Sequence, residues 1–148
     1  MLVDDVVRHQ GNLFEIAGAE QAGVHAADAG YVINPMQCRG QIEGAVAQSL
    51  GAALYEEMVI DESGRVVNPK FRDYHLPSFA DVPRTEVLFA DTCDTIGPMG
   101  AKSMSESPYN PVAAALGNAL ADATGIRFTS VPFKPDRLWP QLKEKFGG

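Results

Sequence analysis

The sequence predicts an α/β (α+β) fold in which helices pack on one mixed sheet. Strand-like and helical patterns follow one another in the order β-α-β-β-β-loop-α-β-α, which is typical of helices layered on a sheet. Two segments have the apolar period of amphipathic helices, and the short runs between them alternate as strands do. With 148 residues, 45% of them hydrophobic and 21% charged, the chain has the size and composition of one globular domain.

The first third of the chain predicts a lead-in, a strand and a long helix. Residues 1–22 have no clear period and are either a short strand or helix or a poorly ordered lead-in. Residues 23–35 predict a strand that runs into a turn at Asn34-Pro35. Residues 36–57 predict a core-facing helix, because apolar side chains recur every four positions at Ile42, Val46, Leu50 and Leu54.

The middle of the chain predicts extended structure and a long loop. Residues 58–68 predict a hairpin with its turn at Asp61 to Gly64. Residues 71–77 predict a short extended piece, and residues 84–91 alternate as a strand does. The loop over 92–107 is rich in Gly, Ser and Thr, and a loop of this length in a compact domain tends to be functional or disordered.

The last third predicts a helix, a strand and a final helix. The second strong helix covers 110–124, with Asn110 as its N-cap. Residues 126–132 predict a strand. Residues 134–146 have a helical pattern that Pro140 breaks or restarts.

Charge and cysteine usage exclude several classes of protein. The net charge of −7 argues against nucleic-acid binding, which requires neutralisation of phosphates by Lys and Arg, and against anionic membranes. Cys38 and Cys93 form no CxxC pair, and the three histidines are scattered, so no metal site is predicted from the residues. With no signal peptide and no apolar run of about 18 residues, we expect a cytoplasmic protein.

Two segments, the first predicted helix and the long loop, carry candidates for chemistry, each with a simpler explanation. Gly40 and Gly44 lie inside the predicted helix, where glycine costs about 0.5–1 kcal/mol, so either a neighbouring element or a ligand approaches the backbone. Gln41 beside them offers donors and an acceptor, or is an ordinary exposed side chain. In the loop, Glu106 is either a solvated carboxylate or a general base, and Lys102 is either a surface cation or an anion ligand.

Four segments together resemble one family. "YVINPMQCRGQIEGAVAQSLGAALYEE", "NPKFRDYHLPSFADVPRTEVLF", "GPMGAKSMSES" and "PVAAALGNALADATGIRFTSVPF" stand in the order found near the C-terminal end of the molybdenum-binding large subunit of the xanthine dehydrogenase and aldehyde oxidase family, the molybdenum hydroxylases. The resemblance covers about residues 23–142. It implies that 23–148 is the C-terminal part of a molybdopterin-binding catalytic domain, while 1–22 matches poorly.

The resemblance implies a chemistry and a set of cofactors. The family oxidises an aldehyde or N-heterocycle carbon with oxygen derived from water, and a glutamate acts as base toward the molybdenum-bound hydroxide. The cofactor is molybdopterin, often in the cytosine dinucleotide form. The 2Fe-2S clusters and FAD are expected on other subunits or domains, so the implied partners are the remainder of the molybdenum-binding subunit, the iron–sulfur and flavin subunits and a small-molecule substrate.

Carried over position by position, the family's catalytic glutamate falls on Glu106. The glutamine of its "GQ(I/V)EG" motif falls on Gln41, which would contact the cofactor. Small residues are then expected to leave room for the cofactor. The positions expected to surround it are Gly40, Gly100, Ala101, Lys102 and Ser103.

The chain departs from the family in its loop and in its length. The family loop usually reads Gly-Val-Gly before the glutamate, whereas this chain has Ser103-Met104-Ser105, so substrate identity cannot be carried over. The chain is also far shorter than the family's large subunit and would be incomplete without a partner. We therefore expect an uncovered apolar face on the helix over 36–57. The alternatives are a non-catalytic or degenerate fragment acting as a binding or assembly module, and an unrelated hydrolase that uses Glu106.

Overall fold

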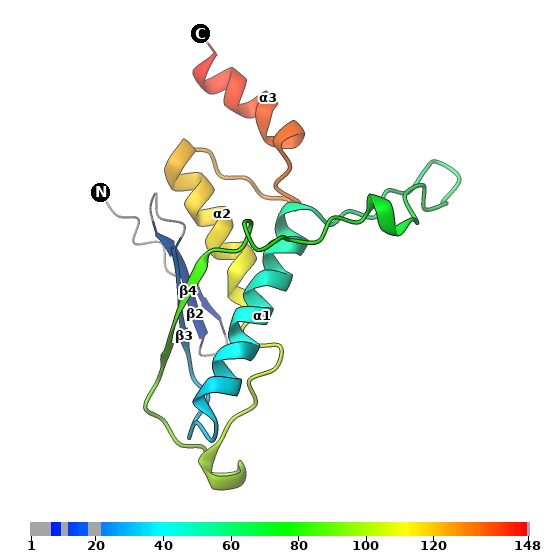
Figure 1. Cartoon of the computed structure of the whole chain (residues 1–148). Helices are drawn as coiled ribbons and strands as arrows, with labels where there is room; N and C mark the ends of the chain where they lie inside the picture. Colours follow the sequence, from blue (N-terminus) through cyan, green and yellow to red (C-terminus); the bar gives the residue numbers. More distant parts are fainter. Residues whose placement is uncertain (1–6, 10–11, 18–21, 148) are drawn as a thin grey trace.

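The chain forms a four-stranded mixed sheet with helices on one side (Figure 1). The computed structural model describes residues 7–9, 12–17 and 22–147. The strands β1 (Val7–His9), β2 (Asn12–Ala17), β3 (Ala22–Ala27) and β4 (Arg84–Phe89) lie in that order across the sheet. β1–β2 and β2–β3 pair antiparallel, whereas β3–β4 pair parallel. The predicted mixed sheet is therefore confirmed.

Part of the predicted lead-in belongs to this sheet. β1 and β2 fall within residues 1–22, and Phe14 of β2 is opposite His25 of β3. The rest of the lead-in lies outside the described residues. Because β3 and β4 are parallel, the chain between them must cross from one end of the sheet to the other, and a helix makes that crossing.

The helix α1 (Pro35–Leu54) confirms the first predicted helix, although it ends three residues earlier than expected. It begins where Asn34 accepts a hydrogen bond at Oδ1 from the Gln37 N–H at 3.0 Å, and proline occupies its first turn. Its apolar stripe is buried as predicted, with Ile42, Val46 and Leu50 at most 4% exposed.

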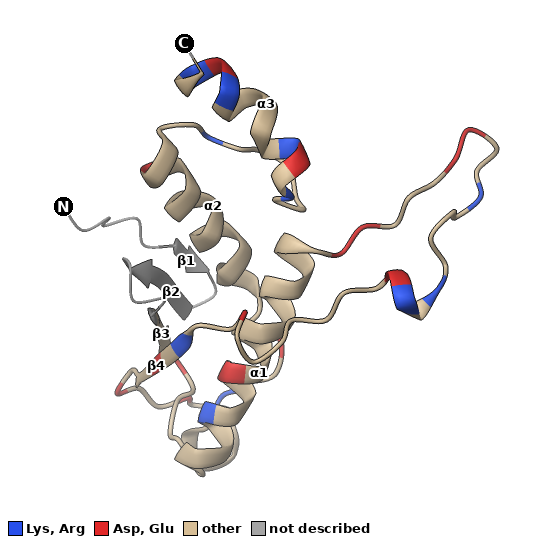
Figure 2. Cartoon of the chain, turned by 45° about the horizontal axis from the view of Figure 1, so that its top comes forward, with Lys and Arg blue, Asp and Glu red and all other residues tan. Residues whose placement is uncertain are grey.

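The helix α2 (Asn110–Thr124) packs beside α1 and lies against β1 and β2. Figure 2 shows that it carries almost no charge, which suits its position between α1 and the sheet. Val46 and Leu50 of α1 meet Val112 and Ala115 of α2 in one cluster of the core.

The start and end of α2 test two sequence expectations. Gly125 ends the helix with a left-handed φ of +64°. The prediction of Asn110 as N-cap is wrong. The N-cap is Tyr109, whose own backbone is helical because its N–H already closes a turn onto the Glu106 carbonyl at 3.0 Å.

The predicted strand over 126–132 is wrong, since this segment is irregular. Side chains in and just after this segment enter the core instead: Phe128 and Phe133 are each 7% exposed and cluster with Ala53. The helix α3 (Pro135–Phe146) then covers this cluster with Leu138 and Leu142. Pro140 lies inside α3 without ending it.

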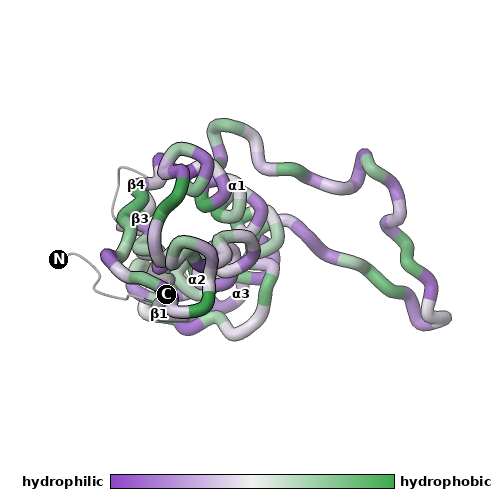
Figure 3. The backbone as a smooth tube through the Cα atoms, turned by 90° about the horizontal axis from the view of Figure 1, so that it is seen from below, coloured by the Kyte–Doolittle hydropathy of each residue, from purple (hydrophilic) through white to green (hydrophobic). Residues whose placement is uncertain are grey.

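Residues 56–80 form an arm that projects from the C-terminal end of α1 (Figures 1 and 3). Its tip is the predicted hairpin, held by a bridge between Ile60 and Val66 with a turn closed by the Gly64 N–H on the Asp61 carbonyl at 2.9 Å. The expected extended piece over 71–77 is partly wrong, because Phe71–Asp73 is a short 3₁₀ helix.

The two most exposed large apolar side chains of the described chain lie on this arm: Phe79 is 100% exposed and Phe71 96%. Met58 and Leu76 of the arm are each 68% exposed. On α1 the exposed positions are mainly polar residues or glycine, with Met36 as the exception. None of the helices among the described residues is long and apolar enough to cross a membrane.

Candidate functional site

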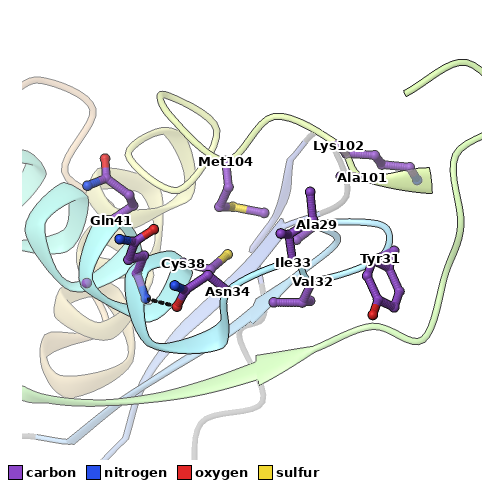
Figure 4. A pocket seen from close by; sticks show the side chains of 12 residues that line it. Ala29, Tyr31, Val32, Ile33, Asn34, Cys38, Gln41, Ala101, Lys102 and Met104 are labelled. Carbon is purple, nitrogen blue, oxygen red and sulfur yellow. Dashed lines mark hydrogen bonds between the residues drawn. The ribbon is translucent and has the colours of Figure 1, made fainter. Parts of the chain in front are cut away.

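A hollow of about 770 Å³ opens where three segments meet, and its volume is in the range of small-molecule sites. Its walls are the segment after β3, the first turns of α1 and the loop after β4 (Figure 4). Four of the residues singled out from the sequence line it: Gly40, Gln41, Ala101 and Lys102. The structure thus brings together positions about sixty residues apart in the chain.

The α1 wall presents an open backbone and an exposed amide. A methyl group built on Gly40 would meet no atom within 4 Å in the described part of the chain, and the same holds for Gly44. A neighbouring element of this chain therefore does not account for these glycines among the described residues. Gln41 is exposed beside Gly40, and Cys38 lies one turn before Gln41 with its pKa raised by burial.

The loop wall is held by a clasp at the end of β3 that the sequence did not reveal. The Lys102 ammonium lies 2.6 Å from Asp28 Oδ2, and the other carboxylate oxygen accepts hydrogen bonds from the Thr92 hydroxyl and, at 3.1 Å, from the Gly30 N–H. The hydrogen bond from Lys102, followed by those from Thr92 and Gly30, lowers the pKa of Asp28 to about 2. The carboxylate thus stays ionised, and Lys102 serves first to hold the loop.

Backbone contacts complete this attachment. Gly30 and Ala101 form an isolated β-bridge, and the Lys102 N–H donates to the Ala29 carbonyl at 2.8 Å. The Gly100 carbonyl accepts from the N–H groups of Tyr31 at 2.9 Å and Asp94 at 2.8 Å. One loop is thereby fastened to the end of β3 at several points.

The glycines of the loop have a different role from the one expected. Gly100 has φ +79° and is buried, and a methyl group there would overlap the Cys93 sulfur. A methyl on Gly97 would overlap the Ala101 carbonyl, and one on Gly30 the Gly100 carbonyl. These glycines allow the loop to pack on itself and on the segment after β3, rather than leaving space for a ligand.

Glu106 lies beyond the residues that line the hollow. Its side chain is exposed, and so is that of Ser103. The hydroxyl oxygens of Ser103 and Ser105 lie 3.3 Å apart. Met104, between the two serines, is half-buried and does line the hollow. The structure therefore brings the α1 wall and the loop wall together, while Glu106 is exposed and does not line the hollow.

Neither wall provides a metal site from protein side chains. In the ranges that the structure describes, no group of three or more His, Cys, Asp or Glu side chains is placed to hold an ion. His25 is fully buried in β3, and burial lowers its pKa from 6.5 to about 4, so it is neutral at pH 7.

The chain is similar to molybdopterin-binding subunits of known proteins. Residues 21–83 match the model of a molybdopterin cofactor-binding domain. The chain is 40% identical over 116 residues to the putative xanthine dehydrogenase molybdenum-binding subunit XdhA of Escherichia coli, which covers 78% of this chain and 15% of that protein. It is 41% identical over 118 residues to the aldehyde oxidoreductase molybdenum-binding subunit PaoC of the same species, covering 78% and 16%.

Solved structures agree in fold. Quinoline 2-oxidoreductase from Pseudomonas putida superposes with a TM-score of 0.78 at 30% identity, covering 90% of this chain and 18% of that one. The Cu,Mo-dependent CO dehydrogenase gives a TM-score of 0.76 at 28% identity, covering 92% and 18%. The chain therefore spans only about 15% of the length of the curated relatives it matches.

Proposed function

Because this chain belongs to the family of molybdopterin-binding large subunits of xanthine dehydrogenases, aldehyde oxidoreductases and CO dehydrogenases, we propose that it forms one wall of a molybdenum hydroxylase active site. The observation that carries this proposal is the hollow between α1 and the loop after β4, where Gly40, Gln41 and Ala101 face a common space. The proposed substrate is an aldehyde or an aromatic N-heterocycle, the classes named for PaoC and for quinoline 2-oxidoreductase.

The residues present fit a bulky cofactor on the α1 side. The backbone at Gly40 is open, so a flat or bulky group can approach the helix, and the Gln41 amide offers two donors and one acceptor at that point. Ala101 faces the same space, while Gly100, Lys102 and Ser103 shape or hold the loop behind it. When bound, the molybdopterin cofactor supplies the two-electron redox chemistry, and its cytosine dinucleotide form is our proposal.

We assign the proton transfer to Glu106. Its carboxylate accepts a proton from the water-derived nucleophile that attacks the substrate carbon, and general-base catalysis of this kind contributes about 10²–10⁴-fold in rate. Two features support the assignment: the side chain is exposed at the end of the loop, and the backbone after it is fixed by the turn that opens α2. The α1 wall and the loop wall would form one side of the site, and a facing wall that excludes water would complete it.

We further propose that the remainder of the molybdenum-binding subunit supplies this facing wall and covers the arm over residues 56–80. The side chains of Phe71 and Phe79 are almost fully exposed, and Met58 and Leu76 of the same arm are each 68% exposed; a large exposed apolar surface marks an interaction site. Two ion pairs form within the arm, Arg65 with Asp61 at 3.3 Å and Arg72 with Asp73 at 3.6 Å. Iron–sulfur clusters and FAD on other subunits would carry the electrons away.

Replacement of Glu106 by glutamine tests the proposal. A tag on this chain is used to purify the molybdenum-containing complex, and turnover of an aldehyde and of quinoline is measured beside the molybdenum content. We expect Glu106→Gln to abolish turnover while the molybdenum content stays near that of the wild type. The matched control is Glu144→Gln on α3, an exposed carboxylate away from the hollow, which should keep its activity.

Two outcomes would contradict the proposal at different levels. Full activity of Glu106→Gln would remove the base assignment but leave the cofactor wall intact. A wild-type complex without molybdenum would favour the alternative, a binding or assembly module that keeps the fold without the chemistry.

A further inference from the structure

The segment that carries Glu106 is fastened at both ends. Before it, the backbone of Ala101 and Lys102 is hydrogen-bonded to the residues that follow β3. After it, Pro108 is fully buried at the entrance to α2. Between these two anchors, residues 103–105 form no backbone hydrogen bond with a turn, loop or cap in the part of the chain that the structure describes. The segment therefore depends on side chains to hold its shape.

Met104 is the apolar side chain that ties this segment to the core. It is half-buried and packs against the cluster formed by Ala27, Ile42 and Val87, whereas its neighbours on both sides are exposed serines. The hydroxyl oxygen of Ser107 lies 3.8 Å from the Met104 sulfur. Figure 4 shows Met104 reaching down from the loop toward α1.

The cluster joins the two proposed walls of the site. Ile42 is completely buried and directly follows Gln41 in α1, while Met104 stands two residues before Glu106. One apolar contact region therefore sets where the loop lies relative to the face of α1 that carries Gln41. Methionine is well suited to such a contact because its unbranched, flexible side chain fills irregular gaps.

We propose that Met104 is a positioning residue, which holds the Glu106 carboxylate in register with the Gln41 face of α1. This inference rests on the proposed function, since it concerns the base of that same site. Truncation of Met104 to alanine removes the anchor and lets the segment between Lys102 and Pro108 move. A displacement of about 1 Å at a reacting group can lower the rate on the order of 10²-fold.

The test compares three variants of the molybdenum-containing complex: Met104→Ala, Met104→Leu and Leu116→Ala. Leu116 is half-buried on α2, packs in other clusters of the core and does not line the hollow, so it controls for lost packing. We expect Met104→Ala to lower kcat on the order of 10²-fold with little change in KM or molybdenum content. Met104→Leu should restore most of the rate, and Leu116→Ala should keep it despite a similar loss of thermal stability.

The inference is overturned if Met104→Ala keeps a kcat close to that of the wild type. It is also overturned if Met104→Ala and Leu116→Ala lose activity in parallel with their stability, because Met104 would then serve only the fold. The Glu106→Gln variant separates the two levels. If it is inactive while Met104→Ala is fully active, the base assignment stands and only the positioning role fails.

Discussion

Replacement of Gly40 by alanine is expected to stabilise the chain and weaken cofactor binding at the same time. Gly40 is the sixth residue of α1 and lies well inside the helix, where alanine is favoured over glycine by about 0.5–1 kcal/mol. A methyl group at this position meets nothing within 4 Å among the described residues, so no clash offsets the gain. For a chain of this size the melting temperature should rise by about 1–4 °C.

The same methyl group projects into the space that we assign to the cofactor. Overpacking a well-fitted contact costs about 1–3 kcal/mol, which corresponds to about 5- to 150-fold in affinity. The molybdenum recovered per chain should therefore fall in Gly40→Ala. Urea unfolding of the chain and metal analysis of the purified complex measure the two effects independently.

Gly44 provides the matched control, because it is equally open and lies one turn along α1 but does not line the hollow. Gly44→Ala should bring a similar gain in stability with an unchanged molybdenum content. Normal molybdenum content in Gly40→Ala would show that nothing approaches this face closely, and the cofactor wall would have to lie elsewhere. A lower unfolding free energy in Gly40→Ala would show that the added methyl group is not accommodated, and it would contradict the open space found beside Gly40.

Three further predictions concern the fold and its partner. Acidification from pH 7 to 5 should lower the unfolding free energy by about 2 kcal/mol. Burial lowers the pKa of His25 from 6.5 to about 4, so only the unfolded chain binds the proton in this range. The loss should vanish in His25→Leu. Gly100→Ala should destabilise the chain by about 1–3 kcal/mol in urea unfolding, because its φ of +79° and the adjacent Cys93 sulfur both oppose a methyl group. Phe71→Ser combined with Phe79→Ser should leave unfolding of the chain unchanged but prevent recovery of the molybdenum-containing complex, and recovery of an intact complex would contradict the role of the arm.

The helices and strands could be predicted where local pattern and tertiary burial agree. The stripe of Ile42, Val46 and Leu50 is both periodic and buried, so α1 was predicted almost to its ends. The segment around Phe128 and Phe133 shows the opposite case. Its two aromatic side chains enter a cluster beneath α3, and no partner strand lies beside it in the described chain.

The candidate site was predictable in position but not in construction. The resemblance pointed to seven positions. Gly40, Gln41, Ala101 and Lys102 line one hollow, whereas Gly100, Ser103 and Glu106 do not, and the chemical roles of all seven stay predictions. The ion pair of Lys102 with Asp28 could not be foreseen, because the two residues are 74 positions apart and nothing in the sequence links them. The partner of a lysine in a loop cannot be read from the sequence when the fold brings it from a distant segment.

Two kinds of glycine lie at or beside the hollow, and they bear on the proposal that this chain forms one part of an active site. Gly30 and Gly100 are filled by this chain's own backbone and side chains, so they fasten the loop without help from a partner. Gly40 is empty on its outer side, so it is open to a group that this chain does not contain. If the loop depended on the cofactor for its shape, its glycines would also face open space. Because they do not, the loop wall should keep its structure in the isolated chain, without the cofactor.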